Sequence, residues 1–220
     1  MEKSKNKTRI IVECAMMVAI AAGLELISKI IGLELPFGGT ITIASMFPIV
    51  LASYKYGLGY GLLTGFTYSI VQILLGLKTV AAMFMPGDEQ MVLWKALCVC
   101  FLDYILAYTL LGLGGMFRNS IQKPAFALAL GTVAALTLRF IIHIISGAIF
   151  YGAWAEWFFT QDGFYAIGEK ILEKYSGTSL AIVYSVFYNG LYMIPEIIIT
   201  TVVAIILGNV PAVTGKKRVQ

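Results

Sequence analysis

The stretch Leu136-Thr-Leu-Arg-Phe-Ile-Ile-His-Ile-Ile-Ser-Gly-Ala-Ile-Phe-Tyr151 continues an apolar run that begins at residue 125. A run of this length can cross the hydrocarbon core of a bilayer as one helix. It nevertheless contains Arg139 and His143, and a charged side chain at a helix centre costs roughly 2.5 to 3.5 kcal/mol on insertion scales. Ionisable residues at this depth pair, line a cavity or bind something polar. The stretch therefore predicts a transmembrane helix with a polar site in it.

Composition extends this interpretation to the whole chain. Of its 220 residues, 59% are hydrophobic and only 13% are charged, and the mean hydropathy is +0.85. A soluble domain needs more charge than this to cover its surface. We therefore expect an all-α integral membrane protein. The net charge of +4 comes mostly from basic residues in loops and tails, where they set orientation, so no nucleic-acid partner is expected.

Further apolar runs predict six transmembrane helices in a single domain that covers residues 1–220. Their expected bounds are 9–32, 40–54, 58–76, 91–117, 125–151 and 179–208. The second is short for a crossing and contains Pro48, so we expect it to be kinked, and either tilted or stacked against other protein. The segment 152–177 mixes aromatic and acidic residues, which suits an interfacial loop or a short amphipathic helix.

The basic residues predict the orientation of these spans. With six spans both termini lie on one side of the membrane, and that side collects Lys3, Lys5, Lys7, Arg9, Lys55, Arg118, Lys123, Lys216, Lys217 and Arg218. The other side has only Lys29, Lys78, Lys95, Lys170 and Lys174. Cytoplasmic loops carry an excess of Lys and Arg, so both termini are expected to be cytoplasmic.

Two of the predicted helices carry ionisable residues near mid-depth. In the fifth, Arg139, His143, Gly147 and Tyr151 recur every four residues and so share one face. The fourth supplies Asp103, followed by Tyr104, and we expect its pocket-facing side to lie against the fifth helix. Two interpretations remain open: Asp103 neutralises Arg139 as a structural pair, or it stays partly free for an organic cation or a hydrogen-bond donor. His143 likewise belongs either to a ligand site or to a satisfied contact between helices.

Polar residues also interrupt the sixth predicted helix, which carries Tyr184, Tyr188, Asn189, Tyr192 and Glu196. Asn189 either contacts a ligand or bonds helix to helix. Pro195 frees a backbone carbonyl and is expected to help open a cavity. Glu196 receives no definite role from the sequence.

Small residues recur along the first predicted helix at Ala15, Ala19 and Gly23. A ridge of this kind lets another helix approach closely. Packing within the protein and docking of a partner both remain open. Glu13 beside the ridge is left without a role.

Motifs of common enzymes are absent. The sequence has no G-x-S-x-G elbow, no H-E-x-x-H helix and no Walker A loop, and its single histidine gives no metal-ligand set. We therefore expect neither an enzyme nor a metal or cofactor in this chain. A chain without a nucleotide-binding module cannot itself couple transport to ATP. It therefore binds its ligand passively, depends on an ATPase partner or exploits an ion gradient.

Four segments of the chain carry a family resemblance. They are Leu102-Asp-Tyr-Ile-Leu-Ala-Tyr108, Leu138-Arg-Phe-Ile-Ile-His-Ile-Ile-Ser-Gly147, Tyr184-Ser-Val-Phe-Tyr-Asn-Gly190 and Ala15-Met-Met-Val-Ala19. Together they resemble the thiamine-specific substrate-binding component of energy-coupling-factor transporters, over nearly the whole chain. The most specific features are the acid-Tyr pair, the His followed by Ser-Gly, and the Tyr with Asn five positions later.

The resemblance implies a six-helix protein of a prokaryotic plasma membrane that captures thiamine from outside. It implies docking through the small-residue ridge onto a transmembrane coupling subunit bound to two ATPases, which use the ATP. The implied thiamine contacts are Asp103, Tyr104, His143, Tyr184 and Asn189, with Arg139 and Gly147 shaping the same wall. Thiamine joins a cationic thiazolium to an aminopyrimidine, which calls for a carboxylate, aromatic faces and hydrogen-bonding groups.

Two departures from the family pattern bear on the site. Family members often have Glu at the position of Asp103, and they place Trp where this chain offers Phe37 and Tyr151. Trp154 or Trp157 is expected to substitute from the following loop. The segment 33–40 is expected to close over the ligand.

Three other functions remain as alternatives. The same fold could bind a different vitamin, such as riboflavin, or a thiamine precursor. A membrane-embedded enzyme could use His143 and Asp103 as an acid/base pair on a lipid. A lone proton-coupled carrier would need no ATPase partner.

Overall fold

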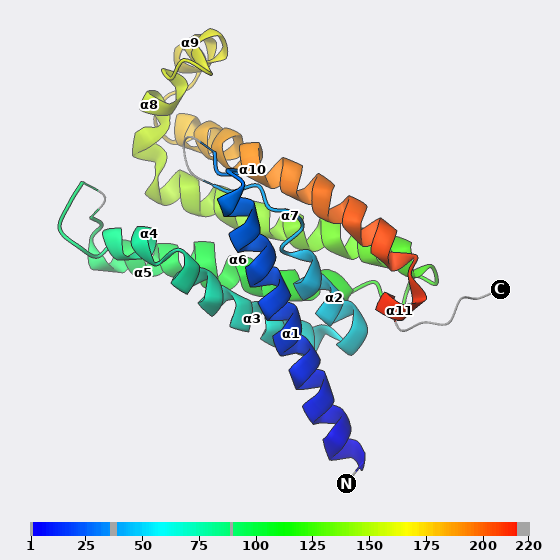
Figure 1. Cartoon of the computed structure of the whole chain (residues 1–220). Coiled ribbons are helices and arrows are strands. Elements are labelled where there is room, and N and C mark those ends of the chain that lie inside the picture. Colours follow the sequence, from blue (N-terminus) through cyan, green and yellow to red (C-terminus); the bar gives the residue numbers. More distant parts are fainter. Residues whose placement is uncertain (1, 36–38, 89, 215–220) are drawn as a thin grey trace.

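The computed structural model describes residues 2–35, 39–88 and 90–214. Within these ranges the regular elements are helices, apart from one isolated antiparallel bridge between Glu34 and Thr40. Long helices cross one another in a bundle, with short helices at its two ends (Figure 1). The expected all-α fold is confirmed.

Five helical segments in the described ranges are long and apolar enough to cross a membrane. They are Lys7–Ile30 within α1 (Glu2–Ile30), α3 (Leu58–Leu75), the segment Leu93–Gly115, α7 (Pro124–Phe150) and α10 (Gly177–Gly208). Their bounds lie close to those expected for the first, third, fourth, fifth and sixth spans. Leu, Ile, Val, Phe and Ala predominate there, so hydropathy alone locates the helices.

The second expected span requires correction. Its helix, α2 (Phe47–Tyr56), begins seven residues later than residue 40, and its 10 residues are too few for a crossing. Pro48 does not kink it, because proline in the first turn lacks only an N–H that has no helical partner there. Almost all of α2 is buried, as expected for a segment stacked against other protein. The count of six transmembrane helices is therefore not confirmed.

The fourth span is one continuous helical path with three different windings. The α-helix α5 (Leu93–Val99) passes into a π-helix, η1 (Cys100–Leu106), then into α6 (Ala107–Thr109) and a 3₁₀-helix, η2 (Leu110–Gly115). The π-helix contains Asp103, and such segments occur frequently at functional sites. In η2, Gly112 meets the backbone of Gly61 on α3 so closely that a Cβ at either position would collide. The glycines therefore permit the close approach of these two helices.

Short helices lie between the long ones, and one more follows α10. They are α4 (Leu77–Ala82), η3 (Gly152–Trp154), α8 (Ala155–Phe159), α9 (Tyr165–Lys174) and α11 (Pro211–Thr214). Figure 1 shows α8 and α9 extending beyond one end of the bundle, above α7 and α10. The segment 152–177 thus contains the short helix that its composition predicted.

Glu13 gains a role at the opposite end of the bundle. Its carboxylate accepts hydrogen bonds from Arg9 Nε at 2.8 Å, from Lys55 Nζ at 3.1 Å and from the Tyr56 hydroxyl. The cluster ties α1 to the end of α2. This is the end where many of the basic residues assigned to the cytoplasmic side lie. Residues 216–218, also assigned to that side, fall outside the described residues, and the orientation itself stays a prediction.

The main core lies where α1, α2, α3, α7 and α10 meet. Its largest buried side chains include Tyr68 of α3, Leu136 of α7 and Met193 of α10. Figure 1 shows α7 and α10 side by side along much of their length, and they pack more extensively than any other pair. The polar residues of the fifth and sixth spans therefore face one another.

Candidate functional site

Asp103 lies against α7, as the sequence predicted. Its Oδ1 is 2.9 Å from His143 Nδ1, and its Oδ2 accepts a hydrogen bond from Ser146 Oγ at 2.7 Å. The side chain of Asp103 keeps 19% exposure, whereas that of His143 keeps 8%. A carboxylate oxygen has two lone pairs and can accept two hydrogen bonds. Asp103 therefore retains capacity for a further donor.

Arg139 fixes the state of His143. Arg139 Nε donates to His143 Nε2 at 3.1 Å, and arginine has only donors, so Nε2 carries no proton. The ring proton accordingly sits on Nδ1 and is donated to Asp103. The guanidinium also contacts Met46 Sδ at 2.6 Å through Nη1 and lies 4.2 Å from the ring centre of Tyr108. Arg139 and Asp103 are thus connected through a neutral histidine and form no direct ion pair in the described structure.

Gly147 lets α10 approach this cluster. A Cβ there would collide with Ser185 Oγ and lie 3.1 Å from Asn189 Nδ2. Asn189 Nδ2 donates to the carbonyls of His143 at 3.2 Å and of Ser185 at 2.9 Å, and its Oδ1 accepts from the Tyr192 hydroxyl at 2.5 Å. In this structure Asn189 therefore bonds helix to helix. Its role as a ligand contact stays a prediction.

An aromatic cluster borders the site at its α8 side. Tyr184 and Tyr188 lie 5.6 Å apart between ring centres, and the buried ring of Phe158 lies 5.3 Å from Tyr184 and 5.9 Å from Tyr188. Trp154 and Trp157 instead pack edge to face on each other, with about half of each side chain exposed. Phe158 and Phe159 are the buried aromatic residues of α8, and Phe158, which the sequence did not single out, is the one beside Tyr184 and Tyr188.

Tyr104 and Tyr151 belong to a second hydrophobic cluster. Both pack beside the buried residues Val80 and Met83, and the Tyr151 hydroxyl donates to Met83 Sδ at 3.6 Å. Tyr151 also packs against the cluster that contains Tyr184. Tyr151 thus bridges the hydrophobic cluster around Val80 and Met83 and the aromatic cluster that contains Phe158 and Tyr184.

The segment 33–40, expected to close over a ligand, is described only in part, because residues 36–38 with Phe37 lie outside the described residues. Its base is defined by the hydrogen bond from Leu35 N to Gly39 O at 2.9 Å. Gly39 has a φ of 82°, and a Cβ there would meet the ring of Tyr192. The base therefore lies directly on α10, while its closure stays a prediction.

The cluster is not arranged to hold a metal ion. Across residues 2–35, 39–88 and 90–214, no three His, Cys, Asp or Glu side chains gather at a suitable place. Both ring nitrogens of His143 are engaged, one with Asp103 and the other with Arg139. An organic ligand that approaches the accessible side of Asp103 suits this arrangement better.

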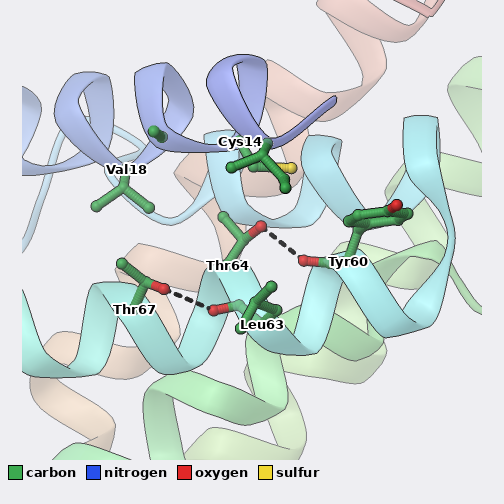
Figure 2. Close-up of a pocket in the computed structure, with 8 residues that line it drawn as sticks. Cys14, Val18, Tyr60, Leu63, Thr64 and Thr67 are labelled. Carbon is green, nitrogen blue, oxygen red and sulfur yellow. Dashed lines mark hydrogen bonds between the residues drawn. The ribbon is translucent and has the colours of Figure 1, made fainter. Parts of the chain in front are cut away.

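A separate groove lies between α1 and α3 (Figure 2). Its volume is about 170 Å³, and it is lined by Ile11, Cys14, Ala15, Val18, Tyr60, Leu63, Thr64 and Thr67. The Thr64 and Thr67 hydroxyls donate to carbonyls of their own helix at 2.6 and 2.9 Å, those of Tyr60 and Leu63 respectively. The groove is therefore apolar in character, and it shares no residue with the Asp103 cluster.

Several residues of the cluster received no site role from the sequence. Ser146 is three positions after His143 and Ser185 four before Asn189, so helical spacing could have identified both. Met46 and Tyr108 carried no such signal. Their contact with Arg139 arises only where separate segments meet.

Comparison with known proteins gives a consistent result. Residues 11–157 match the family described as thiamine transporter protein. The thiamine transporter ThiT of Bacillus subtilis strain 168 is 33% identical over 216 residues, which cover 94% of this chain and 93% of that protein. ThiT of Lacticaseibacillus paracasei is 26% identical over 159 residues, covering 66% of this chain and 70% of that one.

A solved structure of ThiT from Listeria monocytogenes has the same fold. Its TM-score is 0.64 at 19% identity, and the match covers 95% of this chain and 98% of that chain. The apolar spans and these relatives identify a multi-pass protein of a bacterial cell membrane, with a transport rather than a catalytic role. This confirms the resemblance drawn from the sequence, and the chain belongs to the thiamine transporter protein family.

Proposed function

We propose that this chain is the thiamine-binding subunit of an energy-coupling-factor importer. It captures thiamine from outside and delivers it inward when docked on a coupling subunit bound to two ATPases. The observation that carries the proposal is the held but accessible carboxylate of Asp103.

The charge of Asp103 suits a cationic vitamin. His143 and Ser146 each donate to one of its oxygens, which leaves further lone pairs on the carboxylate for a ligand. In a membrane interior a charge of this kind calls for a partner of opposite sign. The positive charge of Arg139 lies beyond the histidine, so the accessible side of the carboxylate is left for an incoming cation or an amino group.

The aromatic residues supply the other half of the chemistry. Tyr184, Tyr188 and Phe158 present edges and faces beside the polar cluster. Aromatic faces attract cations and stack on planar rings. A thiazolium and an aminopyrimidine would each find a suitable surface there.

Thiamine binding tests this proposal directly. Calorimetry on the purified protein should show saturable binding of thiamine and no binding of riboflavin. Each half of thiamine, the pyrimidine and the thiazolium, should bind more weakly than the whole vitamin because it fills only part of the site. Preferential binding of riboflavin or of a precursor would transfer the proposal to that ligand, and turnover of a bound lipid would favour an enzyme.

The small-residue ridge supports docking rather than internal packing. Ala15 and Ala19 are exposed, and a Cβ at Gly23 would meet nothing within 4 Å. The exposure of these positions favours docking over packing within the protein, the other interpretation of this ridge. The ridge is available to a helix of a partner, as the family resemblance implies.

Bulky residues on the ridge should block the partner. We expect Ala15→Trp combined with Ala19→Trp to abolish co-purification with the coupling subunit and ATPases, because tryptophan keeps the helices apart, while thiamine affinity is unchanged. The matched control is Ile198→Trp with Val202→Trp, an exposed pair at the same spacing on α10. Lost thiamine binding in the ridge variant, or thiamine uptake by the isolated chain in liposomes, would count against the docking proposal.

A further inference from the structure

Residues 40–46 run into the bundle without helical structure. Thr42, Ala44, Ser45 and Met46 of this segment are each at most 3% exposed. Non-helical backbone at membrane depth persists only where its polar groups find partners inside the protein. The partners of this segment therefore decide its position.

On α1, Ser28 Oγ accepts from Ile43 N at 2.9 Å and Glu25 accepts from Ser45 Oγ at 3.2 Å, whereas Glu196 of α10 makes two shorter bonds to the segment. Thr42 N donates to Glu196 Oε2 at 2.7 Å, and Thr42 Oγ1 donates to Glu196 Oε1 at 2.7 Å. The carboxylate is fully buried, and it also accepts from Thr200 Oγ1, within its own helix, at 3.2 Å. The two shorter hydrogen bonds of Glu196 come from Thr42 in the non-helical segment 40–46. Only the longer one comes from its own helix, α10.

The bound threonine is rigidly joined to the residue that contacts Arg139. Ser45 N donates to Thr42 Oγ1 at 3.1 Å, which closes a tight turn, and Ala44 within this turn has a φ of 54°. Met46 follows the turn directly and places its sulfur 2.6 Å from Arg139 Nη1. A shift of Thr42 would therefore move the sulfur away from the guanidinium.

We infer that Glu196 is a positioning residue for ligand binding. By holding Thr42 it fixes the turn, the turn places Met46 on Arg139, and Arg139 keeps its donor on His143. The histidine then keeps its proton directed at Asp103. The inference rests on the proposed function, since it assigns Glu196 to the same binding site.

The test measures thiamine dissociation together with melting temperature. Glu196→Ala should raise the dissociation rate about tenfold, because both buried bonds to Thr42 are lost. Glu196→Gln should restore most of the affinity, since its carbonyl accepts from Thr42 N while its amide donates to a hydroxyl. A purely structural role predicts a lower melting temperature with unchanged dissociation.

Variants of Thr42 and Thr200 show which hydrogen bonds of Glu196 slow thiamine dissociation. Thr200→Val removes the bond within α10 and should leave dissociation within about twofold of wild type. Thr42→Val should weaken binding, and adding Glu196→Ala should give less than the sum of the separate effects, because both act through one contact. If Glu196→Ala does not fold, Thr42→Val against Thr200→Val carries the test.

The outcomes separate the two proposals. Wild-type protein that binds no thiamine overturns the proposed function. If wild type binds thiamine and folded Glu196→Ala releases it at the same rate, only the role of Glu196 is overturned. Equal weakening by Thr200→Val and Thr42→Val would also overturn it.

Discussion

Replacing Asp103 by Asn should nearly abolish thiamine binding. The change removes the negative charge and keeps the shape of the side chain. Truncating one partner of a buried, hydrogen-bonded charge pair costs about 2 to 5 kcal/mol, so affinity should fall at least about 30-fold. Calorimetry measures this loss.

The design separates loss of charge from loss of structure. Ser146 can turn its hydroxyl to accept from the asparagine amide, so the link to α7 persists and the melting temperature should change little. Asp103→Glu keeps the charge and should retain much of the affinity. Wild-type affinity in Asp103→Asn would show that the carboxylate does not bind the cation.

Gly147→Ala should weaken thiamine binding and destabilise the protein together. The new Cβ would collide with Ser185 Oγ and crowd Asn189 Nδ2, so α10 must move away from α7. Overpacking of this kind costs about 1 to 3 kcal/mol, which corresponds to a fall in melting temperature of roughly 5 °C. Thermal unfolding and calorimetry on one preparation measure both effects.

The control is a second glycine in the same helix pair. At Gly190 on α10 a Cβ would meet Ile194 Cδ1 at 3.5 Å and Phe140 Cζ at 3.8 Å, which are ordinary contacts. Gly190→Ala should therefore leave affinity unchanged and should not lower the melting temperature. A similar response from the two variants would mean that the close approach at Gly147 has no special importance.

Much of the site could be predicted because helices repeat locally. Arg139, His143 and Gly147 recur every four residues, so a shared face follows from helical geometry alone. Contact between Asp103 and α7 was also foreseen. Each of these residues is anomalous in an apolar run, and that anomaly is visible without a structure.

The local conformation of the backbone was harder to predict from the sequence. The spans around α2 and η1 have hydropathy typical of helices, yet residues 40–46 form no helix and Asp103 lies in a π-helix. Close approach of glycine-containing segments and hydrogen bonds from distant side chains decide these conformations. Neither leaves a periodic trace in the sequence.

The sequence by itself determined five apolar spans and the polar face on α7, because hydropathy and helical period are local properties. Only the tertiary structure decided that His143 stands between Arg139 and Asp103, and that Glu196 holds Thr42. Thr42 and Glu196 are 154 positions apart in the sequence. A buried polar group forms a hydrogen bond with any complementary group that packing brings within about 3 Å. Its partner is therefore fixed by how the helices pack, which no local pattern encodes.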